Sequence, residues 1–76
     1  MSHDKSHDKL IRMANQIATF FESKPHGEAV TGVAAHISDF WPPVMRGQLF
    51  DHITHGGAGL KPLVLEAAPK IRAVPV

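Results

Sequence analysis

The chain has 76 residues and contains no cysteine and no tyrosine. Without cysteine it forms neither a disulfide nor a thiolate-bound zinc site. A chain of this size buries a smaller share of its surface than a larger domain does, so we expect either close helix packing or a partner that completes the core. No apolar run approaches the roughly 18 to 20 residues that cross a bilayer, and the polar opening MSHDKSHDK is not a signal peptide. The sequence therefore predicts no membrane partner.

The chain also lacks a large net charge of either sign. The formal net charge is +1, and it is spread along the chain: residues 1–40 sum to −1 and residues 41–76 to +2. A protein that binds nucleic acid through its phosphates normally carries a basic stripe or patch. Neither half of this chain has one, so we expect no nucleic-acid partner.

Apolar residues recur with the period of an α-helix, and prolines and glycines separate the periodic segments. We predict an all-α fold, a small bundle of three main helices and a short C-terminal helix, covering about residues 7–23, 28–40, 43–55 and 62–68. Residues 7–68 form the single helical domain, between a disordered N-terminal tail (residues 1–6) and a C-terminal tail (residues 69–76).

Each main helix has an apolar face. In the first helix it spans about half the circumference, wider than in ordinary surface helices, so we expect that helix to touch more than one neighbour. In the second helix, Gly32 and Ser38 fall on the polar side. The apolar face of that helix is predicted to hold Ala29, Val30, Val33, Ala34, Ile37, Phe40 and Trp41.

The segment Phe40-Trp41-Pro42-Pro43 joins the second and third helices and holds the only tryptophan. Trp and Phe bury the largest apolar areas, so we interpret this corner as the hinge of the fold. Arg46 falls inside the apolar arc of the third helix, where it snorkels, pairs with a carboxylate or anchors a partner. Trp, Met and Arg are enriched at protein interfaces. The candidate partner-binding residues are Trp41, Met45, Arg46 and Phe50.

No chemical site is evident. His52 and His55 share a helix face, but a zinc site needs three or four ligands and the sequence identifies no others. Two solvated histidines on a polar face are the simpler interpretation. The glycine-rich run from Gly56 to Gly59 follows a helix and lacks the GK[ST] ending of a phosphate loop. We therefore expect no catalytic residue, no metal and no cofactor in this chain.

Several pieces of the sequence resemble the delta subunit of NAD-dependent formate dehydrogenase, in the same order and at similar spacing over about residues 9–65. They are KLIRMANQIA (residues 9–18) with FF (20–21), GVAAHI (32–37) with FW (40–41), Pro43, MR (45–46) and Leu49, and GL (59–60) with PLV (62–64). The chain departs from the family at three positions. Pro42 and Val44 stand where the family more often has an acidic and a basic residue, and Lys61 where an acidic residue is usual.

The resemblance implies a non-catalytic accessory subunit of a cytoplasmic complex that oxidises formate and reduces NAD. It places the molybdenum or tungsten, the iron–sulfur clusters and the flavin in larger subunits. It also implies that this chain binds the catalytic alpha subunit and supports it or its maturation. The alternative is a free-standing helical binding module that self-associates or binds another partner. A third hypothesis is a histidine-based metal-binding protein.

Overall fold

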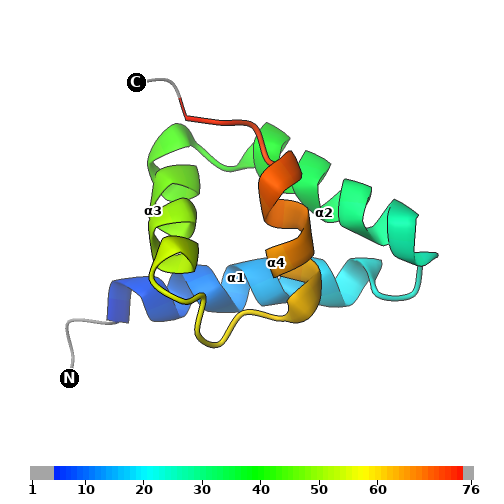
Figure 1. Cartoon of the computed structure of the whole chain (residues 1–76), viewed down its shortest axis with the longest axis horizontal. Helices are drawn as coiled ribbons and strands as arrows, with labels where there is room; N and C mark the ends of the chain where they lie inside the picture. The colour runs from blue at the N-terminus through cyan, green and yellow to red at the C-terminus, as the bar shows by residue number, and fades with distance from the viewer. Residues whose placement is uncertain (1–4, 75–76) are drawn as a thin grey trace.

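The computed structural model describes residues 5–74, which form helices joined by short loops, with no strand in that range. The helices are α1 (Lys5–Phe21), α2 (His26–Phe40), α3 (Pro43–Thr54) and α4 (Pro62–Ala67), followed by the 3₁₀ turn η2 (Ala68–Lys70) (Figure 1). The predicted all-α fold of three main helices and a short fourth one is confirmed.

The predicted boundaries lie within two residues of the observed ones. Helix α1 begins earlier than predicted, so Lys5 and Ser6 belong to the helix. Residues 1–4 of the predicted tail lie outside the described residues. Helix α2 begins directly after Pro25, whose carbonyl accepts a hydrogen bond from the N–H of Ala29. Helices α3 and α4 begin at Pro43 and Pro62 as predicted, because proline lacks the N–H that the first helical position leaves unpaired.

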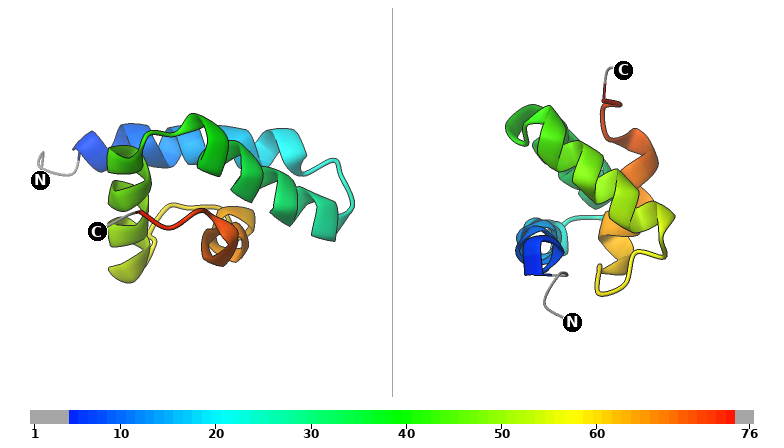
Figure 2. Two further views of the ribbon diagram at one scale, coloured as in Figure 1. Left: turned by 90° about the horizontal axis from the view of Figure 1, so that it is seen from above. Right: turned by 90° about the vertical axis from the view of Figure 1, so that its left-hand side faces the viewer.

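Helix α1 is the longest helix and packs against the other three. Figure 1 shows α3 standing over the N-terminal end of α1, while α2 runs back along α1 and α4 is seen between α3 and α2. The views in Figure 2 confirm that α2 and α4 lie beside each other, and both pack on α1. After α4 the last described residues pass across the corner where α2 meets α3 (Figure 1).

One core joins all four helices, and its most tightly enclosed members are aliphatic. Ala14 and Ala18 of α1 are fully buried, so the backbone of α1 lies close to its neighbours. The other buried apolar residues are Leu10, Ala29, Val30, Val33, Ala34, Ile37, Trp41, Leu49, Leu60, Leu63, Val64, Ala67 and Ile71. Ile71 lies in the predicted C-terminal tail, which therefore contributes to the core.

Three residues of α2 differ from the predicted pattern. Ser38 is buried because the C-terminal segment covers it, and its Oγ accepts a hydrogen bond of 2.8 Å from the N–H of Arg72. Gly32 lies under the ring of Phe21, so it faces α1 rather than solvent. Phe40 is 72% exposed although the helical period puts it on the apolar face. Periodicity gives the direction of a side chain, but not the stretch of the helix that a neighbour covers.

The loop between α3 and α4 is fastened to α1 by one side chain. Asn15 donates a hydrogen bond from Nδ2 to the carbonyl of Gly59 and accepts one at Oδ1 from the N–H of Lys61, both of 2.9 Å. Gly57 and Gly59 have φ angles of +66° and +84°, in the left-handed region that favours glycine. These two glycines let the chain turn back so that α4 starts beside α1.

Candidate functional site

Arg46 is buried at 5% exposure and binds backbone of its own chain. It donates hydrogen bonds from Nη1 to the carbonyl of Trp41 at 3.0 Å and from Nε to the carbonyl of Arg72 at 3.2 Å. The guanidinium therefore joins the corner between α2 and α3 to the C-terminal segment. The bond to the Trp41 carbonyl is buried, and leaving a buried carbonyl without a donor costs about 1–3 kcal/mol.

The other three predicted partner-binding residues lie at different depths. Trp41 is 6% exposed, while Met45 and Phe50 are partly buried against the core. Trp41 and Met45 nevertheless each line a surface hollow, and the two hollows are described next. Contact of Trp41, Met45, Arg46 and Phe50 with a partner stays a prediction, and the structure adds that Trp41 and Arg46 are held inside this chain.

The first hollow lies between α1 and α2 and has a volume of about 410 Å³. Its lining is mostly apolar: Met13, Gln16, Ile17, Phe20, Phe21, His36 and Trp41. Phe20 is 69% exposed and packs edge-on against Phe21, with ring centroids 5.0 Å apart. His36 stacks on Phe40 with centroids 4.7 Å apart. Two largely exposed phenylalanines thus flank an apolar hollow.

The second hollow, of about 240 Å³, is lined by Lys9, Leu10, Met13, Met45 and Gln48. Met13 lines both hollows, so they are neighbours along α1. We call this surface the apolar groove and define it by the linings of the two hollows together with Phe40. Methionine side chains adapt their shape to a bound surface, and Met13 and Met45 are both at least partly accessible.

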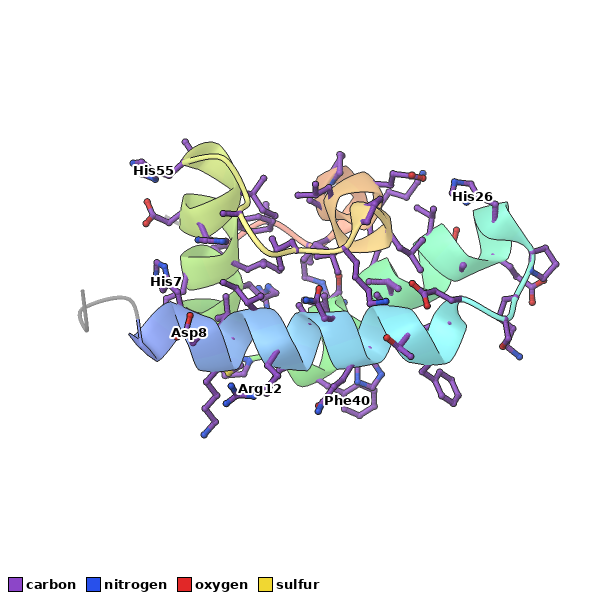
Figure 3. All side chains as sticks on the ribbon, turned by 90° about the horizontal axis from the view of Figure 1, so that it is seen from below. His7, Asp8, Arg12, His26, Phe40 and His55 are labelled. Atoms are coloured by element: carbon purple, nitrogen blue, oxygen red, sulfur yellow. The ribbon has the colours of Figure 1, made fainter. Side chains whose placement is uncertain are left out.

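The groove carries positive charge at one end and no carboxylate in its lining. Lys9 belongs to the lining, and Arg12 lies one turn further along α1. Figure 3 shows Arg12 and Phe40 projecting to the same side of α1, whereas His7 is on the opposite side. Within residues 5–74, the ion pairs of lysine and arginine are Lys61–Glu22 and Arg72–Asp39. Lys9 and Arg12 therefore have no carboxylate partner in the described part of the chain.

His52 of α3 and His55, the residue that follows α3, contact backbone carbonyls. His52 lies 2.8 Å from the carbonyl of Ala58 through Nε2, and donates to it in the tautomer that carries the proton there. His55 makes the equivalent contact from Nδ1 to the carbonyl of Asp51, also at 2.8 Å. No group of three or more histidine, cysteine, aspartate or glutamate side chains with the spacing of a metal site occurs among residues 5–74.

Helical periodicity alone does not reveal the groove. It assigned Phe20 and Phe40 to apolar arcs, and the structure leaves both largely exposed. The available signal was the unusual width of the apolar arc of α1, which exceeds what three short neighbours cover.

None of the helices among the described residues is long and apolar enough to cross a membrane.

The fold defines the class of this chain as a small all-α domain with an apolar groove on its surface. This chain is a member of the NADH-dependent formate dehydrogenase delta subunit family FdsD, whose model matches residues 9–68. The match covers most of the chain and confirms the resemblance found in the sequence. No curated protein matches the chain.

Proposed function

We propose that this chain is a non-catalytic accessory subunit of a cytoplasmic NAD-dependent formate dehydrogenase. In this proposal it binds the catalytic alpha subunit and supports that subunit or its maturation. The family match supports membership of this enzyme complex, because the family is described as the delta subunit of the enzyme. The chain itself acts by binding, and the chemistry belongs to the larger subunits.

The apolar groove is the observation that carries the proposal. Two phenylalanines that are 69% and 72% exposed flank a hollow whose lining is mostly apolar. Burial of apolar surface contributes about 25 cal/mol of favourable free energy per Å², so covering these rings stabilises a complex. Clustered exposed apolar side chains mark interaction sites in proteins of this size.

The test is co-purification with a tagged alpha subunit. The wild-type chain is expected to co-purify at a fixed stoichiometry, and the double variant Phe20→Ser/Phe40→Ser to be lost. Leu65→Ser is the matched control, because Leu65 is a partly exposed apolar residue on α4, outside the groove. Circular dichroism checks that all variants keep their helices. Absence of the wild-type chain from the purified complex contradicts the proposal.

The alternative is a free-standing module that self-associates through the same groove. It makes the opposite prediction for the isolated chain. Light scattering would then show a concentration-dependent dimer that Phe20→Ser/Phe40→Ser abolishes, with no binding to the alpha subunit. The family match favours the accessory subunit.

A further inference from the structure

We infer that the apolar groove receives an amphipathic α-helix of the larger subunit, and that this helix carries a carboxylate at the end that lies over Lys9 and Arg12. The inference rests on the proposed function and adds to it the chemistry of the docking partner.

The spacing of the hollows matches a helix. The α1 residues that line the two hollows (Lys9, Leu10 and Met13; Met13 to Phe21) are centred about seven residues apart, which is about 10 Å along the helix axis at about 1.5 Å of rise per residue. Two side chains at positions i and i+7 of a partner helix are about 10.5 Å apart on one face. Each hollow therefore takes one apolar anchor, in the manner of helices that bind in grooves.

An extended segment fits less well. The walls of the groove are helices, whose interior backbone groups are already paired, so a strand finds no row of free N–H and C=O groups to bind. A helix satisfies its own backbone and needs only a matching apolar face. The shape and chemistry of the walls thus favour a helix over a strand.

The positive charge at one end of the groove predicts the second feature of the partner, which is a carboxylate. Lys9 lines the groove, Arg12 lies beside it, and neither has a carboxylate partner within residues 5–74. A partner that covers this end removes water from both cations, which costs free energy unless a negative group pairs with them. Opposite charge across the contact also speeds association and fixes its orientation.

The same reasoning disfavours a second copy of this chain. In an isologous dimer each groove faces another groove. The lining of the groove contains no aspartate or glutamate, so a second copy brings no carboxylate to Lys9 in that arrangement. A partner of different, acidic sequence pairs with it.

The first experiment measures the affinity of the purified chain for the alpha subunit at two salt concentrations. Lys9→Glu/Arg12→Glu is expected to weaken binding by at least about tenfold at low salt and to flatten its salt dependence. Lys24→Glu/Lys70→Glu makes the same change in net charge at exposed positions outside the groove, and less than about a twofold effect is expected. Full affinity of Lys9→Glu/Arg12→Glu overturns the inference.

The second experiment identifies the partner segment directly. A photo-crosslinking amino acid replaces Gln16, which is exposed and lines the groove, or Ala35, which is exposed outside it. In the assembled complex the probe at Gln16 is expected to capture a segment of the larger subunit with apolar residues seven positions apart and Asp or Glu at one end. Capture of a second copy of this chain, or of a segment without a carboxylate, overturns the inference.

The outcomes separate the two claims. If the wild-type chain does not bind the alpha subunit, the proposed function fails and the inference falls with it. If Phe20→Ser/Phe40→Ser abolishes binding while Lys9→Glu/Arg12→Glu binds normally, the docking role stands and only the acidic partner is refuted.

Discussion

The guanidinium of Arg46 donates a hydrogen bond of 3.0 Å to the carbonyl of Trp41, five residues earlier in the chain. That carbonyl belongs to the residue that directly follows α2, where the backbone becomes extended. A second bond, from Nε to the carbonyl of Arg72, attaches the C-terminal segment to the same side chain. The corner between α2 and α3 is therefore fixed by a cation inside the fold.

This relationship predicts a loss of stability when Arg46 is shortened. Arg46→Met keeps much of the apolar stem but leaves the Trp41 carbonyl without its donor, and we expect the free energy of unfolding to fall by about 2–3 kcal/mol. Urea unfolding of the isolated chain, followed by circular dichroism, measures it. If Arg46 acts only as a partner contact, the isolated variant unfolds at the same urea concentration as the wild type.

Trp41 is expected to be essential to the isolated fold. Trp41→Ala removes a large buried side chain, which costs about 3–5 kcal/mol. A single core of this size rarely supplies more than about 3–5 kcal/mol of stability, so this variant should be largely unfolded or close to it. Retained helical circular dichroism and a sharp thermal transition, with only complex formation lost, would instead make Trp41 a residue of the interface alone.

Gly32 is expected to resist substitution although it lies inside a helix. A Cβ atom there would sit 2.4 Å from the ring of Phe21, so the ring must move. Overpacking costs about 1–3 kcal/mol, which outweighs the gain of about 1 kcal/mol in helix propensity. We expect Gly32→Ala to lower stability by about 1 kcal/mol.

The control for that substitution is Gly27→Ala, since a Cβ at Gly27 meets nothing within 4 Å. That variant should be neutral or slightly stabilising. In a Phe21→Ala background, Gly32→Ala should become stabilising as well, and a double-mutant cycle measures the coupling. Equal effects of Gly32→Ala with and without the ring would show that the ring is not the cause.

Asn15 is expected to fasten the loop before α4. Asn15→Leu removes a donor and an acceptor that bind the backbone of Gly59 and Lys61, and we expect a loss of about 1–3 kcal/mol. Hydrogen exchange gives the sharper readout, because the N–H of Lys61 loses its acceptor and should exchange faster. Unchanged exchange at Lys61 would mean that the loop is held by other contacts.

The sequence predicted the helices well because local chemistry determines where they begin. Pro43 and Pro62 both stand at the first position of a helix, as the sequence indicated. The role of Arg46 was not predictable in this way. Its acceptors are backbone carbonyls of Trp41 and Arg72, and a carbonyl is present at every residue, so nothing in the side-chain pattern identifies it.

The groove lay beyond prediction for a related reason. Ser38 is covered by the C-terminal segment around Arg72, 34 residues further along the chain, whose N–H donates a hydrogen bond to the Ser38 hydroxyl. Whether Phe20 and Phe40 are covered depends on how far the helices overlap. Both are properties of the tertiary arrangement, and the helical period is the same in either case.

The central claim is that the apolar groove is covered in the formate dehydrogenase complex. Hydroxyl-radical labelling of the isolated chain and of the assembled complex tests it most directly, with mass spectrometry reading the modification of each phenylalanine, methionine and leucine. We expect labelling of Phe20, Phe40 and Met13 to fall several-fold in the complex, while Leu65 on α4 is labelled equally in both. Equal labelling of Phe20 and Phe40 in the free chain and in the complex would contradict the claim.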